Sequence, residues 1–456
     1  MAMRDAGSRG FLRPVLAIGA VTALALTGCA PGDFETGFTA TADEIEAALH
    51  EETTIDFWSW SPQAADMARA FEAEYPAVTV NVTNVGGSDV AYTKLQNAMK
   101  AGSGIPDVVY MEYLAMPQFA LQGSLTDLED YANGGLSDHF SDEIWSQVAI
   151  RGGAYGVPLD SGPLVLYYRA DVFERHGIEV PTTWAEYADA ARQLHEADPT
   201  AYITADAGDG NGALAMIWQA GGTPFASSGE DLSVDLADTG STAWADMWGG
   251  LLADGLIDNG VAQWSNEWRR GMADGRYATW VAGAWGGSAL ASHVPSAAGQ
   301  WRVTDIPQYT DGTDGADPQR TGAQSGGSGL TVPAGSDDKL AAVGFTQWMT
   351  TSETANRMWV EAGQVPAVSD VLASDAWLDI EDPYFGGQRV NRVYAEASQA
   401  VLPNWEYLPF EPYANSVFSD TVGQAFAGNT TLRAGLAAWE RRITDYGREQ
   451  GFTVNE

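Results

Sequence analysis

Strand-like and helix-like stretches alternate along this chain from residue 54 onward. Residues 54–60, 78–82 and 107–112 are rich in Val, Thr and aromatic residues, as expected of strands. Apolar residues recur at helical spacing in the intervals, over 63–74 and 90–101. This alternation predicts an α/β fold with a mostly parallel sheet. A length of 456 residues is too great for one ordinary core and predicts two lobes or domains.

The stretch 156–173, GVPLDSGPLVLYYRADVF, predicts a crossover between two such lobes. Val165 to Tyr168 form a continuous apolar run, which is typical of a strand buried on both faces of a parallel sheet. The Gly-Val-Pro-Leu-Asp that precedes this run can carry the chain from one sheet to the next. We therefore expect a ligand to be held between the lobes at this crossover.

The first 28 residues have the features of a bacterial secretory signal. Arg4, Arg9 and Arg13 precede an apolar run over 15–26, which is too short for a stable membrane span. The Leu-Thr-Gly that ends this run, followed by Cys29, resembles the lipobox of bacterial lipoproteins. In such proteins the cysteine is lipidated and becomes the first mature residue. An ordinary secretory signal with an incidental cysteine is the alternative.

Cys29 is the only cysteine, so a disulfide within the chain is excluded and an acyl anchor explains the residue best. Residues 1–28 are expected to be removed as a lipoprotein signal peptide. Residues 29–53 are expected to form a lipid-anchored tether with one short helix at 42–51. The predicted location is the extracellular face of the cytoplasmic membrane.

The net charge of −38 argues against nucleic acid and against an anionic membrane surface as partners. It also disfavours an anionic ligand, because phosphate and carboxylate sites usually need clustered Arg or Lys. The sequence has no GxGxxG or Walker loop, no GxSxG elbow and no paired histidines, so we expect no cofactor, no metal and no enzymatic activity. A carboxylate pair of the glycosidase type stays open among 61 acidic residues.

Several aromatic residues fall at or just past the ends of predicted strands and helices, among them Trp58, Trp60, Tyr113, Trp218 and Trp285. Ligands of open α/β sheets bind beyond the carboxyl ends of the strands. An indole face packs against the apolar face of a sugar ring while Asp, Glu, Asn and Gln bond its hydroxyls. The tryptophans at helical spacing are expected in the core instead, namely Trp244, Trp248, Trp348 and Trp439.

Motifs in a characteristic order make the chain similar to the bacterial extracellular solute-binding proteins of family 1, the carbohydrate-binding components of ABC importers that include the maltose-binding type. The similarity covers essentially the whole mature chain. Arg169 departs from the family, which usually has Asn or Asp there. The motifs are Phe71-Glu-Ala-Glu-Tyr-Pro76, Ile105-Pro-Asp-Val-Val109, Gly156-Val-Pro-Leu with Leu166-Tyr-Tyr-Arg169, Tyr277-Ala-Thr-Trp with Trp285, Gly326-Gly-Ser-Gly-Leu330 and Gly363-Gln-Val-Pro366.

This resemblance implies a two-lobed, periplasmic-binding-protein-like fold of type II, with a ligand cleft between α/β lobes that hinge segments join. The N-terminal lobe would comprise residues 54–160 and 326–356. The C-terminal lobe would comprise residues 161–325 and 357–456. The implied crossings lie near 159–162, 324–327 and 352–358.

The resemblance also implies ligand contacts, which transfer by motif position only. They follow the first and third strands, lie at the crossover, or come from the second lobe and the later crossings. The implied contacts are Trp58, Trp60, Glu112, Tyr113, Asp160, Ser161, Trp218, Gly222, Trp285, Gly326 and Gln364.

The predicted function is that of a lipid-anchored, monomeric binding protein. It would capture a neutral mono- or oligosaccharide by hinge closure and deliver it to the transmembrane subunits of an ABC permease. A secreted glycoside hydrolase is one alternative. A binding protein for a cation such as a polyamine is another, which the negative charge would suit. A glycerol-phosphate-type solute is the third, which Arg269 and Arg270 keep open.

Overall fold

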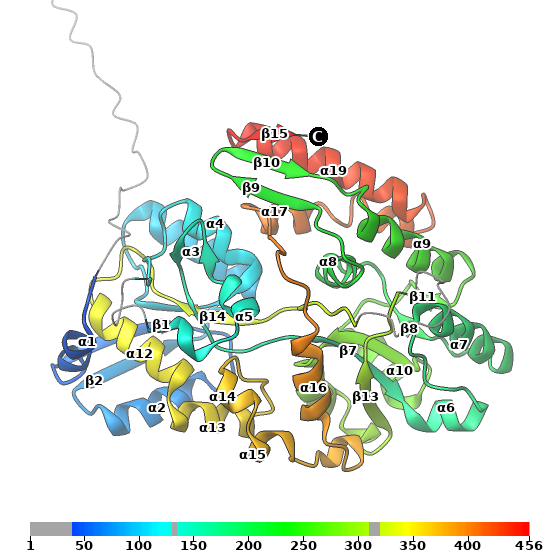
Figure 1. The fold of residues 1–456 in the computed structure, drawn as a ribbon, viewed down its shortest axis with the longest axis horizontal. Helices are drawn as coiled ribbons and strands as arrows, with labels where there is room; N and C mark the ends of the chain where they lie inside the picture. The colour runs from blue at the N-terminus through cyan, green and yellow to red at the C-terminus, as the bar shows by residue number, and fades with distance from the viewer. Residues whose placement is uncertain (1–38, 130–134, 310–319, 456) are drawn as a thin grey trace, which may run out of the picture.

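The computed structural model describes residues 39–129, 135–309 and 320–455, which form two α/β lobes side by side (Figure 1). The sheet of the first lobe has the order β2-β1-β3-β14-β6. β1 runs parallel to β2 and β3, as the alternating pattern predicts, whereas β14 is antiparallel to β3 and β6. The bounds are β1 Thr53–Trp58, β2 Val78–Thr83, β3 Val108–Glu112, β6 Val157–Pro158 and β14 Ser328–Thr331.

Helices cover the sheet of the first lobe, and the final long helices of this lobe come from a much later part of the sequence. Phe57 and Phe71 pack against Phe345, which brings the first strand, the first long helix and a late helix into one core. The helices are α1 Ala42–Ala48, α2 Ala64–Glu74, α3 Ser88–Ala101, α4 Met116–Leu121, α5 Asp142–Ser146, α12 Lys339–Thr351 and α13 Glu353–Glu361, with β4 Ala149–Ile150, β5 Gly153–Ala154 and the 3-10 turn η1 Tyr113–Ala115 beside them.

The second lobe is built on the strand that the crossover leads into. β7 Leu164–Arg169 is almost entirely buried, as its apolar run predicts. Its neighbours β12 Thr279–Gly283 and β13 Trp301–Asp305 are both antiparallel to it, so the expectation of a parallel sheet at this strand is wrong. The prediction failed because an apolar run indicates only that both faces of the strand are buried. Helices cover both faces of this antiparallel sheet, as they would those of a parallel sheet.

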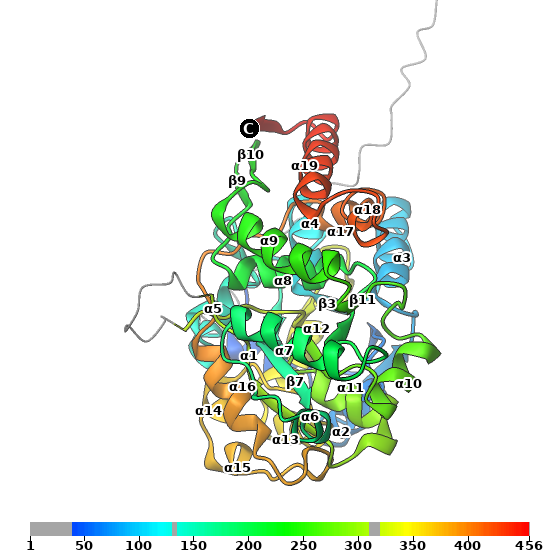
Figure 2. The ribbon, with the colours of Figure 1, turned by 90° about the vertical axis from the view of Figure 1, so that its right-hand side faces the viewer.

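The remaining elements of the second lobe surround this sheet and extend above it (Figures 1 and 2). Trp244, Trp248 and Trp439 lie in its core, as their helical spacing predicts. The elements are α6 Ala170–His176, α7 Trp184–Ala197, β8 Thr204–Ala205, α8 Gly210–Gln219, β9 Phe225–Ser228, β10 Asp231–Val234, α9 Thr239–Ala253, β11 Ile257–Asp258, α10 Asn266–Asp274, α11 Gly286–His293, α16 Val390–Gln399, α17 Glu411–Ser416, α18 Gly423–Phe426, α19 Leu432–Glu449 and β15 Thr453–Asn455.

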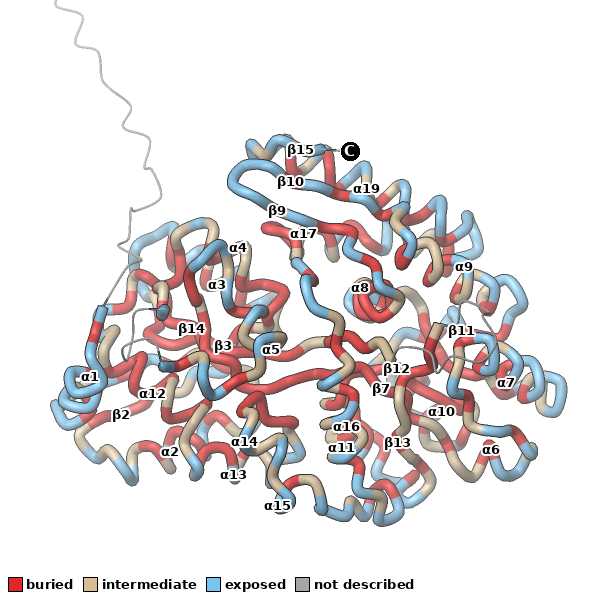
Figure 3. Tube along the Cα trace, viewed as in Figure 1, coloured by how far each residue is buried: buried red, intermediate tan, exposed pale blue. Residues whose placement is uncertain are grey.

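Two segments that join the lobes lie side by side and are buried (Figure 3). Pro163 pairs with Gln324, and the backbone N–H of Ser325 donates to the carbonyl oxygen of Gly162 at 2.7 Å. The side-chain oxygen of Gln324 accepts from the N–H of Gly162 at 2.8 Å. A side chain on Gly162 would collide with the carbonyl of Ser325, so this close approach requires glycine. These two segments lie in the ranges 159–162 and 324–327, where the family resemblance implies crossings.

The third crossing lies later than the predicted range 352–358. Helix α13 packs within the first lobe, where Trp359 is 3% exposed and its Nε1 donates to the carbonyl of Met349. Val368 belongs to the same core, whereas Trp377 belongs to the core of the second lobe. Val365 already belongs to the core of the second lobe, so the chain runs along both cores between Trp359 and Trp377. The third crossing lies in this stretch, which includes α14 Ser369–Leu372 and α15 Asp375–Leu378, and the first lobe does not end at 356.

The start of the first lobe also differs from the prediction. Thr41 and Glu44 form a capping box at the start of α1, and the helix packs against α12 through the buried side chains of Ile45 and Leu49. Residues 40–53 are thus part of the lobe, although a tether was expected up to 53. The signal peptide and Cys29 lie outside the described residues. Within the described ranges no helix has the length and apolar character needed to cross a bilayer.

Candidate ligand-binding cleft

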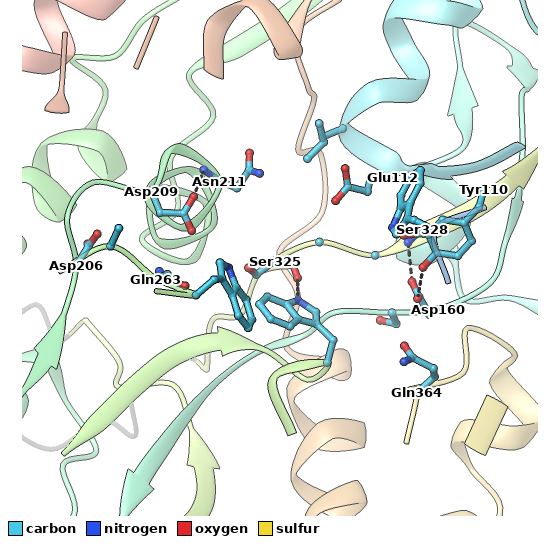
Figure 4. A pocket seen from close by; sticks show the side chains of 18 of the residues that line it. Tyr110, Glu112, Asp160, Asp206, Asp209, Asn211, Gln263, Ser325, Ser328 and Gln364 are labelled. Atoms are coloured by element: carbon cyan, nitrogen blue, oxygen red, sulfur yellow. Dashed lines mark hydrogen bonds between the residues drawn. The ribbon is translucent and has the colours of Figure 1, made fainter. Parts of the chain in front are cut away.

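A cavity of about 570 Å³ lies between the lobes, directly at the crossing segments. Figure 4 shows Glu112 and Asp160 on one side and Asp206 and Asp209 on the other, with Ser325 between them. The first lobe contributes Trp60, Tyr110, Glu112 and Leu114; the crossings contribute Asp160, Ser161, residues 325–328 and Gln364; the second lobe contributes residues 206–209, Asn211, residues 262–264 and Trp285.

Seven of the predicted contact residues line this cavity, and they come from both lobes and from the crossings. The ends of β1 and β3 place the first two of them, and the turn after β12 places Trp285. The seven are Trp60, Glu112, Asp160, Ser161, Trp285, Gly326 and Gln364.

Two predicted contacts, Tyr113 and Trp218, have structural roles instead. Tyr113 is 1% exposed, and its hydroxyl donates to the backbone carbonyl of Asp160 at 2.8 Å, which supports the first crossing. Trp218 is buried with its indole stacked on that of Trp405, and its Nε1 donates to the carbonyl of Leu402. Both aromatic faces are covered by protein, so neither can stack on a ligand in this arrangement.

The other two predicted contacts also lie away from the cavity lining. Trp58 is half-buried at the end of β1 and packs against the core cluster that contains Tyr113. In a continuous strand, residues 58 and 60 would point to the same face. Because β1 ends at Trp58, Trp60 does not follow this rule, and it lines the cleft. Gly222 bonds through its N–H to the carbonyl of Ile217 and lies against the backbone of Gly240.

Trp264 is the largest lining side chain that the sequence analysis missed. It is 41% exposed, and its ring lies near those of Trp285 and Trp268, at centroid distances of 5.9 and 5.3 Å. Its φ of +66° is in the left-handed region, which a bulky residue rarely adopts. Strain of this kind persists at sites where surrounding structure holds it. Its exposure and its φ are known only from the structure, and no sequence pattern marked this loop tryptophan in advance.

Four acidic residues line the cleft, and the described lining contains no Lys, Arg or His. Asp160 accepts hydrogen bonds from the N–H of Ser328 at 2.6 Å and from the hydroxyl of Tyr110 at 3.2 Å. Burial is the main cause that raises the pKa of Asp160 to about 7. The carboxyl group of Asp160 thus takes up a proton near neutral pH, which makes it either a donor or an acceptor toward a hydroxyl.

A second buried carboxyl lies across the cleft. Asp206 accepts from Nε1 of Trp248 at 2.9 Å and from the N–H of Gly208 at 2.8 Å. Burial again dominates and raises the pKa of this group to about 6. With Glu112, Asp209, Asn211 and Gln263, the cleft offers carboxyl and amide groups from both lobes. A phosphate or carboxylate ligand would find no cation among these groups.

No cluster of three or more His, Cys, Asp and Glu suited to a metal ion occurs in the described part of the chain. Aromatic faces together with carboxyl and amide groups can instead hold a neutral, hydroxylated molecule by stacking and hydrogen bonding. The lobes, the hinge and this cleft define a protein that binds a small ligand between two lobes.

Comparison with known families identifies the class. The profile of the family "Bacterial extracellular solute-binding protein" matches residues 58–356, and this chain belongs to that family. An ABC transporter associated binding protein from B. animalis subsp. lactis Bl-04, solved in complex with β-1,6-galactobiose, is 36% identical. Its TM-score is 0.79, and the match covers 88% of this chain and 99% of that one.

Other relatives agree with this assignment. The lactose-binding protein of Rhizobium radiobacter is 27% identical over 77% of this chain and 82% of its own length. The arabinooligosaccharide-binding protein of Halalkalibacterium halodurans is 24% identical, over 84% of this chain and 86% of its own. These relatives are binding proteins rather than enzymes. The expected family and the two-lobed fold are confirmed.

Proposed function

We propose that this protein is the sugar-binding component of an ABC importer, and that it captures a neutral oligosaccharide in the cleft. The chemistry of the lining carries the proposal. Trp60, Trp264 and Trp285 offer aromatic faces, and the carboxyl and amide groups around them bond hydroxyls. The relatives with named ligands bind arabinooligosaccharides, lactose and β-1,6-galactobiose, which agrees with this chemistry.

The proposed contacts are the seven predicted residues in the lining together with residues that the structure adds, above all Asp206, Asp209 and Trp264. Ligand that touches both lobes stabilises the closed arrangement, because it interacts with both surfaces only there. The closed protein, a monomer, would then deliver the sugar to the transmembrane permease subunits. No covalent step is involved.

A panel of neutral sugars tests the ligand class. β-1,6-Galactobiose, lactose and arabinooligosaccharides are added to the purified mature protein, and the melting temperature is recorded. A ligand at 100 times its Kd is expected to add about 2.7 kcal/mol of stability, which raises the melting temperature by a measurable amount. No response to any neutral sugar would contradict the proposal.

Two controls separate the alternatives in the same experiment. Affinity for a sugar should stay nearly constant between low and high salt, whereas affinity for a cation such as a polyamine should fall steeply. Chromatography of the sugar after incubation for hours should recover it intact. Release of shorter products would instead point to a glycoside hydrolase.

We also propose that Cys29 carries the lipid that holds the mature protein on the extracellular face of the cytoplasmic membrane. Replacing Cys29 by Ser is expected to move the protein from the membrane fraction to the medium, because the serine hydroxyl does not accept the anchor. Fractionation of the producing cells followed by immunoblotting measures this. Equal membrane association of the two proteins would exclude an anchor at this residue.

A further inference from the structure

A second cavity, of about 540 Å³, lies between the lobes and apart from the cleft. The first lobe contributes residues of α3 and α4 to its lining, and the second lobe contributes α17 and the end of the chain from α19 onward. Both ribbon views place α17 beside α4 (Figures 1 and 2). Like the cleft, this cavity therefore has walls from both lobes.

The lining of the second cavity contains no charged residue within the described part of the chain. This absence is unexpected on a protein with 61 acidic and 23 basic residues, and it favours an uncharged ligand. Four glutamines line the cavity: Gln96 of α3, Gln118 and Gln122 in and just after α4, and Gln450 of the second lobe. Their side-chain amides make no hydrogen bond with any described residue, so each offers a donor and an acceptor.

Aromatic rings form the opposite wall. Tyr413 of α17 and Tyr446 of α19 stack with a centroid distance of 3.5 Å and an interplanar angle of 11°. Phe410 lies edge-on to Tyr446 at 5.1 Å. Phe410 is buried, whereas the two tyrosines are half-buried and offer apolar ring surface and hydroxyls to the cavity. Amides facing aromatic rings reproduce the combination found in the cleft, but without its carboxyl groups.

One side chain, Tyr92, stands between the two cavities. It lines the second cavity, and its hydroxyl donates to Oε2 of Glu112 in the cleft at 2.9 Å. Its ring also lies edge-on to Trp60, which lines the cleft, at a centroid distance of 6.0 Å. Two side chains in contact, Tyr92 on one side and Glu112 or Trp60 on the other, therefore separate the cavities at this point.

We propose that the second cavity is a binding site for a neutral sugar unit, separate from the cleft. The choice of sugar rests on the proposed function. The unit is either a second sugar molecule or the far end of a long chain whose other end occupies the cleft. Since both sites have walls from both lobes, occupation of either site favours the same closed arrangement, and the two sites bind cooperatively.

Gln96 and Gln118 provide the test. Both are half-buried, and replacing them removes no side-chain hydrogen bond to another described residue, so the variants should still fold. The double variant Gln96→Ala/Gln118→Ala is compared with the wild type and with Asn97→Ala. Asn97 is an exposed residue of the same helix that lies outside the cavity lining, so its variant is the matched control. Calorimetry with β-1,6-galactobiose and with β-1,6-galactotetraose gives the affinity and the number of sites for each protein.

If the cavity takes a separate sugar, the wild type binds two galactobiose molecules, and the double variant loses the second one or binds it at least tenfold more weakly. If the cavity takes the far end of a chain, galactotetraose binds the wild type more tightly than galactobiose does, and the double variant removes that gain. In either case Asn97→Ala behaves as the wild type.

One galactobiose per protein, with no gain for the tetraose and no effect of the double variant, would overturn the proposal. A double variant that keeps every sugar affinity but loses transport would overturn it too, and would make the cavity a contact for the permease. The proposed function fails separately. A wild type that binds one galactobiose keeps the proposed function and loses only the second site, whereas a wild type that binds no sugar removes both proposals.

Discussion

Replacing Trp264 by Ala is expected to weaken sugar binding by about 1–3 kcal/mol, the range measured for bases that stack on aromatic side chains. This corresponds to a loss of affinity between about fivefold and about 150-fold. Trp264 lines the cleft and is 41% exposed, and its backbone has a φ of +66°. Backbone strain of this kind is concentrated at binding sites, which supports a ligand contact for this indole.

The conservative change Trp264→Tyr serves as the control, because it keeps an aromatic face at the same place and should retain most of the affinity. Calorimetry with the sugar identified by the panel measures both variants. Unchanged affinity of Trp264→Ala would show that the indole does not contact the ligand.

Trp285 allows a comparison within the same aromatic cluster. Its Nε1 donates to the carbonyl of Ser325 at 2.7 Å, and its ring packs on Trp280. Trp285→Ala is therefore expected to lower both the sugar affinity, by a similar ~1–3 kcal/mol, and the melting temperature, since a crossing segment loses its support. Trp264 also packs edge-on against Trp280, but it is Trp285 that holds the crossing segment by a hydrogen bond to Ser325. Trp264→Ala should therefore lower the melting temperature less than Trp285→Ala does. This difference separates a ligand contact from a residue that also stabilises the hinge.

Asp160→Asn is expected to remove a large part of the pH dependence of stability. The pKa of Asp160 is about 7 in the folded protein, above the ordinary 3.8, chiefly because of burial. The folded state thus keeps a proton that the unfolded chain releases, and the free energy of unfolding decreases as the pH rises from about 4 to about 7. Below about pH 4 Asp160 is protonated in both the folded and the unfolded state, so the free energy of unfolding no longer changes with pH through this residue.

Asparagine stays uncharged throughout this range, so the variant gains stability relative to the wild type as the pH rises. Each pKa unit corresponds to about 1.4 kcal/mol, so the relative gain is of the order of 4 kcal/mol by pH 7. Melting temperatures of both proteins between pH 4 and pH 8 measure it. Asp370→Asn, a change at an exposed residue of α14, is the control and should leave the pH profile unchanged.

Other buried carboxyls leave a remaining pH dependence in both proteins. Burial also raises the pKa of Asp206 to about 6 and that of Glu411 to about 7. Because these groups are present in the variant and in the wild type, their effects cancel in the difference. A constant difference between the two proteins from pH 4 to pH 8 would contradict the assignment to Asp160.

The sequence predicted the local elements well where a periodic pattern was present. The parallel strands β1, β2 and β3 lie where alternation places them, and α7 begins with the capping box of Thr183 and Glu186. The crossover at 156–173 leads into β7, as predicted. The direction of its neighbours was not predictable, because an apolar run specifies burial but not the partners that provide it.

The same limit applies to the cleft. Predicted contacts at strand ends and crossings, such as Trp60 and Asp160, line the cavity. Strand ends and crossings can be located from short stretches of sequence, and these places lie at the cleft. Asp206, Asp209 and Trp264 come from loops without periodicity, and no pattern distinguished them from other polar or aromatic loop residues. For Trp218 the sequence predicted a contact that the structure does not place in the cavity. Its position at a helix end suggested a contact, but Trp405, 187 residues further along, covers its ring face.

The sequence by itself determined the fold class, through the alternation of strand-like and helix-like stretches, and the family, through motifs in a characteristic order. Both depend on residues that are near one another along the chain. Only the tertiary structure decided which side chains meet across the cleft, that the third crossing lies between Trp359 and Trp377, and that residues 40–53 belong to the first lobe. Each of these depends on contacts between distant segments. Such contacts are selected by the packing of whole lobes, and no short stretch of sequence contains that information.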